Sequence, residues 1–250
     1  MDSAAPAAAL RKLPLDQRVI TALDVPDPGS ACTLAAALGE RGRIVKIGLE
    51  LFTAAGPAVL AALRDMNKEV FLDLKYKDIP NTVAGAVGAA CGLGVVMMTL
   101  HADGGRRMME AAVEAAEKAA GPGQRRPALL AVTVLTSLNL AEADETAPGG
   151  GPLRDRIVRL ARLALDSGCD GVVCSPRDLP ALRDEVGGEL LAVTPGVRPA
   201  GSSDDDQCRV ATPAEAMKSG ADFLVVGRPI TRAGDPAAAL LEISQELSSA

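Results

Sequence analysis

Short apolar runs alternate with longer amphipathic runs along the chain from residue 18 onward. Eight of the apolar runs are rich in Val, Ile and Leu and are followed by turn or helix-cap residues, which is typical of buried parallel strands. We therefore predict strands at residues 18–25, 43–50, 69–76, 95–101, 129–136, 171–175, 190–196 and 223–229.

The segments between these strands carry helical signals. Residues 104–120 and 153–168 each gather charged side chains on one stripe, and Glu114 is spaced i,i+4 from Lys118. Residues 212–215, with the sequence TPAE, have the spacing of a capping box with proline at the first helical position. The chain is therefore expected to alternate strand and helix.

Eight strand–helix repeats within 250 residues predict an α/β fold, a (β/α)8 TIM barrel. An open doubly wound sheet is the competing architecture, but no GxGxxG pattern follows the first strand. We expect residues 1–14 to be a loose N-terminal tail or a short surface segment, and residues 15–250 to form a single catalytic barrel domain. Two polar stretches, 141–152 and 198–207, are expected to be long loops.

The composition excludes several classes of function. A formal net charge of −6 and an aromatic content of 2% argue against a nucleic-acid partner, which would need basic and stacking side chains. The sequence has no apolar stretch near the ~18 residues of a membrane span and no signal-peptide pattern, so no membrane partner is expected. Five cysteines without a CxxC pattern and one histidine argue against a zinc site and favour a reducing, cytoplasmic location.

Charged side chains collect where the predicted strands end, which is the catalytic end of such a barrel. Asp24 ends the first strand, Lys46 lies in the second, Asp73 and Lys75 lie in the third, and Asp78 follows it. Asp73 and Lys75 are two residues apart, so they point to the same side of a strand. A structural ion-pair cluster is the alternative reading, but apolar residues would close the barrel at lower cost, which favours a functional role.

A second polar group ends the last two strands. Gly196 and Arg198 follow strand seven, while Gly227 and Arg228 follow strand eight, and these two loops form the usual phosphate site of the fold. Glycine lets a backbone N–H approach a phosphate, and arginine binds it through two hydrogen bonds. Either arginine alone fits a solvated surface charge, but together they predict a phosphate ester substrate. The polar loop that contains Gln207 has the character of a mobile lid.

These motifs together resemble those of the orotidine 5′-phosphate decarboxylase family. Residues 71–83, FLDLKYKDIPNTV, resemble its DxKxxDIPNT signature, and the resemblance extends over roughly residues 18 to 245. One departure is Lys77, where the family often has histidine. Other blocks resemble the family in the same order, namely residues 22–24, 46–52, 132–137, 194–198, 206–213 and 225–230.

The resemblance implies decarboxylation of orotidine 5′-phosphate to UMP and CO₂ in de novo pyrimidine biosynthesis, without a cofactor or a metal. Lys75 would protonate C6 of the pyrimidine, Asp73 and Asp78 would flank the departing carboxylate, and Lys46 would complete the charge network. The substrate contacts implied by the resemblance are Asp24, Lys46, Asp73, Ile79, Thr82, Thr136, Ser137, Pro195, Arg198, Gln207, Gly227 and Arg228.

The resemblance also implies a homodimer with sites shared across its interface. In the family, the residues matching Asp78, Ile79 and Thr82 reach the site of the neighbouring subunit. One chain alone would therefore lack complete sites.

Two other functions stay open. Barrels of the 3-keto-gulonate-phosphate decarboxylase and hexulose-phosphate synthase type share the DxKxxD strand, but they resemble metal enzymes with a carboxylate ligand after strand two. Lys46 lies near that position here and is a poor Mg²⁺ ligand. A barrel that binds a nucleotide without catalysis is the other alternative, and the presence of Lys75 and Asp73 argues against it. Magnesium dependence and turnover would separate the three.

Overall fold

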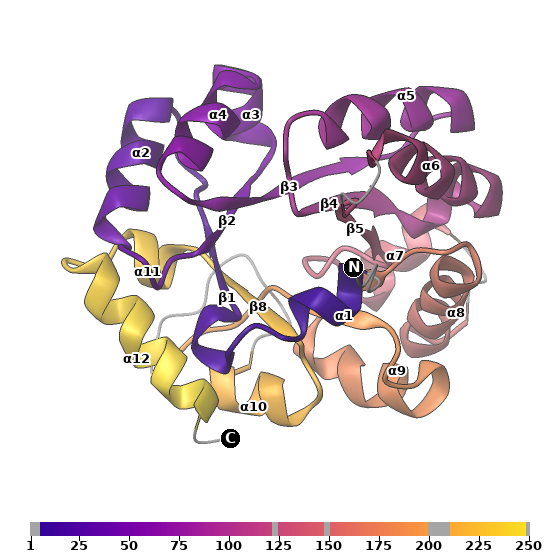
Figure 1. The fold of residues 1–250 in the computed structure, drawn as a ribbon. Coiled ribbons are helices and arrows are strands. Elements are labelled where there is room, and N and C mark those ends of the chain that lie inside the picture. The colour runs from indigo at the N-terminus through magenta and orange to yellow at the C-terminus, as the bar shows by residue number, and fades with distance from the viewer. Residues whose placement is uncertain (1–5, 122–124, 148–150, 200–210, 249–250) are drawn as a thin grey trace.

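Eight parallel strands close into a barrel in chain order (Figure 1). The computed structural model describes residues 6–121, 125–147, 151–199 and 211–248. The predicted (β/α)8 barrel and its eight strands are confirmed, although most strands are shorter than predicted because pairing stops before the polar ends. The strands are β1 Val19–Ala22, β2 Ile44–Ile47, β3 Glu69–Tyr76, β4 Met97–His101, β5 Ala128–Val132, β6 Gly171–Val173, β7 Leu191–Thr194 and β8 Phe223–Val226.

Helices surround the barrel, and the predicted helices within residues 104–120 and 153–168 are confirmed as α6 and α8. The predicted capping box also forms, with the Thr212 hydroxyl accepting the Glu215 N–H at 3.2 Å. The helices are α1 Pro6–Leu10, η1 Leu15–Gln17, α2 Pro28–Ala37, α3 Leu49–Ala55, α4 Ala58–Asp65, α5 Pro80–Cys91, η2 Ala102–Gly104, α6 Arg106–Ala119, α7 Leu140–Thr146, α8 Leu153–Asp166, η3 Pro176–Asp178, α9 Leu179–Val186, α10 Pro213–Lys218, α11 Arg228–Thr231 and α12 Pro236–Ser248.

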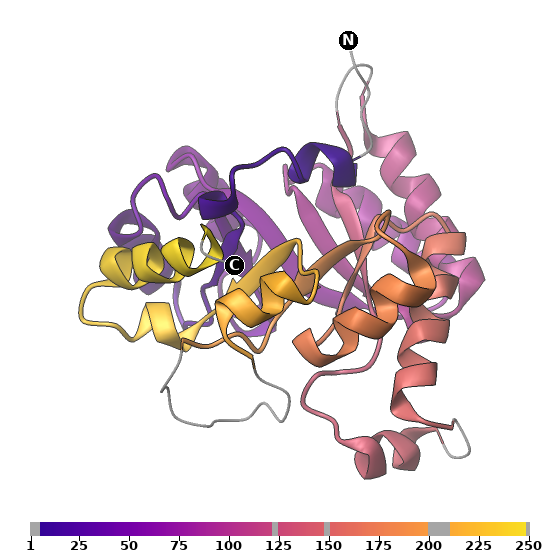
Figure 2. The ribbon, with the colours of Figure 1, turned by 90° about the horizontal axis from the view of Figure 1, so that it is seen from below.

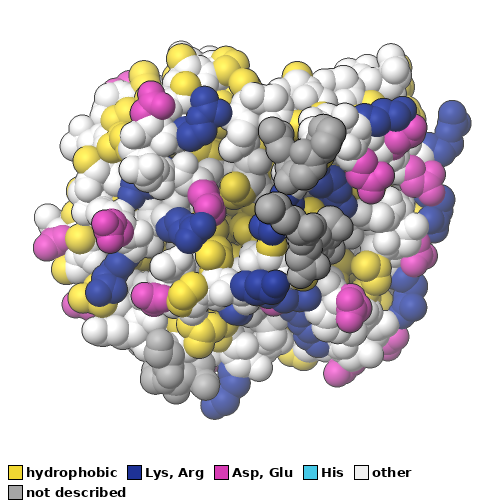
Figure 3. Space-filling view, viewed as in Figure 1, with side chains coloured by type: hydrophobic (Ala, Val, Ile, Leu, Met, Phe, Trp, Pro, Cys, Tyr) yellow, Lys and Arg dark blue, Asp and Glu magenta, His cyan; other side chains and the backbone are white. Residues whose placement is uncertain are grey.

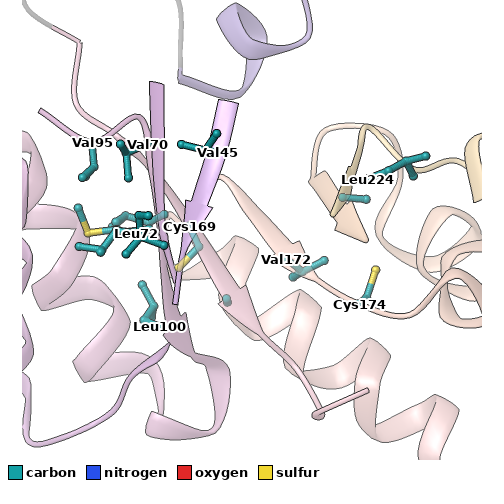
Figure 4. Packing of buried hydrophobic residues seen from close by; sticks show 14 of the residues in the cluster. Val45, Val70, Leu72, Val95, Leu100, Cys169, Val172, Cys174 and Leu224 are labelled. Atoms are coloured by element: carbon teal, nitrogen blue, oxygen red, sulfur yellow. The ribbon is translucent and has the colours of Figure 1, made fainter. Parts of the chain in front are cut away.

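The core has two layers because successive side chains of a strand point to opposite faces. Phe71, Met97 and Phe223 belong to the smaller cluster, which fills the inside of the barrel. The larger cluster lies between the strands and the helices, and Figure 4 shows Leu72 and Leu100 within it. With the interior filled by side chains, the fold leaves space for a ligand only at the barrel's ends.

The cysteines behave as core residues where they are described. Cys169 and Cys174 are buried among aliphatic side chains (Figure 4), and burial raises the pKa of the Cys169 thiol to about 12. Cys32 and Cys91 are half-buried and, like the other two, carry no disulfide. Cys208 lies outside the described residues. These thiols are small apolar packing groups rather than nucleophiles.

The expectation of a continuous loop over residues 141–152 is wrong for its first half. Leu140–Thr146 form α7, which begins with a capping box between Asn139 and Glu142. The Asn139 side chain accepts the Glu142 N–H at 3.1 Å, and the Glu142 carboxylate accepts the Asn139 N–H at 2.9 Å. The acidic composition of the stretch concealed this N-terminal helix signal.

The expectation of a loose tail over residues 1–14 does not hold for residues 6–14. Helix α1 lies across the end of the barrel where the strands begin, opposite to α7 (Figure 2). Ala7 is buried, and Leu10 and Leu13 pack against the cluster inside the barrel. Arg11 binds Asp222, with Nε donating to Oδ1 at 2.8 Å. Residues 6–14 therefore cover the end of the barrel where the strands begin, and we call them the N-terminal plug.

The outer surface mixes both signs of charge. Figure 3 shows Lys and Arg side chains interspersed with Asp and Glu on the face viewed in Figure 1. No helix in the described part of the chain is long and apolar enough to cross a membrane.

Candidate active site

A cavity of about 560 Å³ opens at the end of the barrel where the strands terminate. Most of the residues singled out from the sequence line it, although they come from six different strands or the turns after them. Those that line it are Asp24, Lys46, Asp73, Lys75, Thr136, Pro195, Arg198, Gly227 and Arg228. Gln207 lies outside the described residues.

One wall of the cavity carries four charged groups that alternate in sign. Lys46 Nζ lies 2.8 Å from Asp24 Oδ1 and 3.7 Å from Asp73 Oδ2. Lys75 Nζ lies 2.9 Å from Asp73 Oδ1. Asp73 therefore bridges the two ammonium groups, and its side chain is only 14% exposed. The predicted cluster of Asp24, Lys46, Asp73 and Lys75 forms within this one chain.

Backbone geometry makes room for this cluster. A Cβ on Gly48 would lie 3.1 Å from both Asp24 Oδ1 and Lys46 Nζ, closer than most side chains tolerate. Lys75 has a φ of +53°, in the left-handed region that residues other than glycine seldom adopt. Such strain is characteristic of functional sites, where surrounding contacts hold an unfavourable conformation in place.

Sequence reasoning missed a residue beneath this cluster. Thr99 of β4 is fully buried, and its hydroxyl oxygen lies 2.9 Å from the backbone nitrogen of Lys75 and 2.9 Å from Asp73 Oδ1. The available signal was a hydroxyl residue inside the apolar run 95–101. A threonine is common in strands, so that signal was weak.

The part of the cavity lining that follows β7 and β8 forms a second, basic wall. Arg198 and Arg228 line it as predicted, and Arg232, which the sequence analysis did not select, lines it as well. The backbone N–H of Arg198 donates to the Ala211 carbonyl at 3.0 Å, which fixes Arg198 beside the residue that precedes the N-cap of α10. Arg198 Nε is buried and has no hydrogen-bond partner among the described residues. This wall can therefore accept an anion.

Four of the selected residues do not line the cavity, namely Asp78, Ile79, Thr82 and Ser137. The first three lie at the start of α5 and are exposed, with Ile79 67% exposed. Asp78 uses one carboxylate oxygen to accept the Ile79 N–H at 2.6 Å. Ser137 is exposed next to Thr136.

Lys77, the departure from the family signature, points away from the cluster. Its Nζ lies 2.7 Å from Asp103 Oδ2, and the other oxygen of that carboxylate lies 3.5 Å from His101 Nδ1. Burial lowers the pKa of His101, although Asp103 opposes this effect. The sole histidine is therefore mostly neutral at pH 7.

No group of three or more His, Cys, Asp or Glu side chains within the described ranges is arranged to hold a metal ion. The donors that face the cavity alternate with lysines, and ammonium groups compete with a cation for the carboxylates.

Comparison with known proteins agrees with this geometry. The family model described as "Orotidine 5′-phosphate decarboxylase / HUMPS family" matches residues 17–243. The chain belongs to the orotidine 5′-phosphate decarboxylase / HUMPS family.

Individual members of the orotidine 5′-phosphate decarboxylase family are similar over nearly their whole length. The orotidine 5′-phosphate decarboxylase of Halorhodospira halophila is 53% identical, covering 95% of this chain and 99% of its own. That of Chromohalobacter salexigens is 52% identical, covering 94% and 97%. The crystal structure of orotidine 5′-phosphate decarboxylase from Lactobacillus acidophilus superimposes with a TM-score of 0.82 at 38% identity, covering 92% and 98%.

Proposed function

We propose that this chain is a carboxy-lyase that converts orotidine 5′-phosphate to UMP and CO₂ in pyrimidine biosynthesis, without a metal or a cofactor. The observation that carries the proposal is the alternating cluster of Asp24, Lys46, Asp73 and Lys75 on one wall of the cavity. The names of the close relatives favour this reaction over the synthase alternative.

The basic wall suits the phosphate end of such a substrate. Arg198 has a buried N–H without a partner in the described part of the chain, and Arg228 lines the same wall. Gly196, with a φ of +80°, and Gly227 also line the cavity, and neither has a side chain that would keep a ligand away from the backbone. We assign these residues, with Pro195 and Gln207, to the phosphate, and Thr136 and Ser137 to the pyrimidine. Binding energy from this wall assists the reaction only where it is expressed in the transition state.

The charged wall suits the reacting end. Decarboxylation breaks the bond between C6 and the carboxylate carbon and leaves the electron pair on C6. In the proposed mechanism, the Lys75 ammonium stabilises this developing charge and then transfers a proton from Nζ to C6. Preorganised charge of this kind costs no reorganisation during the reaction. Asp73 holds Lys75 Nζ at 2.9 Å and faces the carboxylate that departs.

We further propose that the enzyme is a homodimer and that Asp78, Ile79 and Thr82 complete the site of the partner subunit. In the single chain these residues are exposed and do not line the cavity. Ile79, at 67%, is the most exposed large hydrophobic side chain in the described ranges, and it lies beside Asp78 at the start of α5. Asp24, Lys46 and Thr82 would then contact the ribose. The absence of disulfides among the described cysteines fits a reducing, cytoplasmic location.

The proposed reaction is tested by the loss of orotidine 5′-phosphate absorbance in EDTA. We expect the wild-type protein to turn over, and Lys75→Ala to lose about 10⁴-fold or more in kcat because it lacks both the charge and the proton donor. Lys77→Ala is the matched control, since Lys77 binds Asp103 and does not line the cavity. It should retain most activity. Wild-type turnover that requires Mg²⁺, or none at all, would contradict the proposal.

The shared site is tested by mixing two inactive variants. Neither Lys75→Ala nor Asp78→Ala should be active alone, but a refolded mixture should recover up to about a quarter of wild-type activity. Half of the dimers are then hybrids, and each hybrid holds one intact site. Mixing Lys75→Ala with Asp73→Ala is the control and should restore nothing, because both residues line the same cavity. Absence of recovery in the first mixture would exclude the shared site.

A further inference from the structure

The buried hydroxyl of Thr99 connects the two groups at the centre of the charged wall. The Lys75 N–H donates to Thr99 Oγ1 at 2.9 Å, and Thr99 Oγ1 donates to Asp73 Oδ1 at 2.9 Å. A hydroxyl has one hydrogen and two lone pairs, so both bonds form at once. The same Asp73 oxygen accepts Lys75 Nζ at 2.9 Å, which closes a ring of three hydrogen bonds.

The backbone of β3 explains why a side chain is needed there. The β3–β4 register pairs Leu72 with Met98 and next pairs Tyr76 with Leu100. Four residue steps on β3 therefore face two on β4, and Lys75 lies in this bulge with its φ of +53°. A bulge leaves N–H groups without their ladder partners. The Thr99 hydroxyl takes the place of a strand carbonyl for the Lys75 N–H.

The location of Thr99 excludes a direct role. It is fully buried on β4 and does not line the cavity. Its hydroxyl instead contacts Lys75 and Asp73, which do line the cavity, so any effect of Thr99 on the site passes through these two residues. A purely apolar side chain such as valine would fill the same volume, so packing does not require the hydroxyl.

We infer that Thr99 is a positioning residue, which holds the strained Lys75 backbone and the Asp73 carboxylate in the arrangement that the reaction uses. This inference rests on the proposed decarboxylase function. Without the hydroxyl, the Lys75 N–H loses its partner and the carboxylate loses one of its donors. The Lys75 ammonium then moves away from the position of the reacting carbon.

The inference is tested with Thr99→Val, which removes the hydroxyl, and Thr99→Ser, which keeps it. Thr99→Val should lower kcat about 10²-fold, the usual loss when a catalytic group is misplaced by about 1 Å, with KM within about threefold because the phosphate wall is unchanged. Thr99→Ser should recover most of kcat. Thr21→Val is the matched control and should leave kcat unchanged. Thr21 is buried in β1, and its hydroxyl has no partner among the described residues.

A second measurement separates failure of this inference from failure of the proposed function. Amide hydrogen exchange at Lys75, in the protein without ligand, should be at least about tenfold faster in Thr99→Val than in wild type or Thr99→Ser. Thr99→Ala serves if Thr99→Val does not fold. An inactive wild type would overturn the decarboxylase function alone. Unchanged exchange, a kcat for Thr99→Val within about threefold of wild type, or an equal loss in Thr99→Ser would overturn the positioning role.

Discussion

The two ends of the barrel carry similar charged side chains, but the protein supplies all of their hydrogen-bond partners at one end and only some of them at the other. At the end where strands begin, Asp170 and Asp222 precede β6 and β8 and each accepts both a backbone N–H and an arginine. Asp222 receives the Ala192 N–H at 2.8 Å, together with Arg11 and Arg183 at 2.8 Å each. These carboxylates have their hydrogen-bonding capacity filled by the protein itself.

At the other end the protein leaves part of that capacity open. Asp24 is 57% exposed, Lys75 is 30% exposed, and Arg198 Nε has no partner in the part of the chain that is described. Lys75 also keeps a strained backbone. The comparison teaches that charges whose partners are all supplied by the protein leave nothing for a ligand to bind, whereas incomplete pairing marks the end where we propose that a substrate binds.

The largest expected effects come from removing one carboxylate charge at each end. Asp73→Asn should lower kcat about 10³-fold, because in the proposed mechanism the carboxylate fixes Lys75 and faces the departing group. Asp73→Asn should destabilise the fold less than Asp222→Asn, since Asp24 still pairs with Lys46 and water in the open cavity can hydrate Lys75. Asp222→Asn should instead leave kcat unchanged and lower the free energy of unfolding by about 3 kcal/mol, with two arginines left underpaired.

Steady-state kinetics and thermal melting measure both variants. A loss of about 3 kcal/mol corresponds to a drop of roughly 6 to 12 °C in Tm for a chain of this size. Each variant is the control for the other. Equal loss of activity in both, or equal loss of stability, would remove the distinction between the two ends.

The contribution of Asp222 to stability should also depend on pH. Burial alone would raise the pKa of the Asp222 carboxyl, but hydrogen bonds from Arg11 and the Ala192 N–H and the nearby guanidinium charges lower it overall. A lowered folded pKa contributes stability above the unfolded value of about 3.9, and this is lost as the pH falls through the folded value. The stability difference between wild type and Asp222→Asn should therefore shrink below about pH 4 in urea titrations. A constant difference down to pH 2 would contradict this account.

The smallest expected effect concerns the strained backbone of Lys75. Lys75→Gly should be about 0.5–1 kcal/mol more stable than Lys75→Ala, because glycine adopts a positive φ without steric cost. Lys77 is the control position, since it lies outside the left-handed region. There the glycine variant should be the less stable one. Urea denaturation gives both differences, and the same ranking at both positions would show that Lys75 carries no strain.

The sequence predicted the fold well because the signals were local and repeated. Apolar runs such as residues 69–76 and 223–229 are too short for helices, and each is followed by a turn or a cap. The charged wall was predictable because parallel strands all end at the same side of a closed barrel. The pair Asp73 and Lys75 needed only the two-residue period of a strand.

Features that depend on contacts between distant segments were not predictable. Helix α1 is too short to be stable alone and is held by Arg11, whose partner Asp222 lies 211 residues away. The role of Thr99 depends on a bulge in the neighbouring strand, and neither the bulge nor the positive φ of Lys75 has a local signal such as glycine. α7 was missed for another reason, since its capping box lay in a stretch rich in acidic residues and glycine.

The N-terminal plug has a consequence for how this protein is made. β1 pairs with β8 as well as β2, and Arg11 binds Asp222, which is synthesised 211 residues later, so this segment completes its contacts only when β8 is available. During translation, β1 has an open edge until Val226 has left the ribosome, and contacts at such long separation form slowly. The cavity, which includes Ala22 of β1 and Val225 of β8, comes into existence only when that ring is joined. The cavity therefore forms only after the residues of β8 have been synthesised, and the edge of β1 that pairs with β8 is exposed until then.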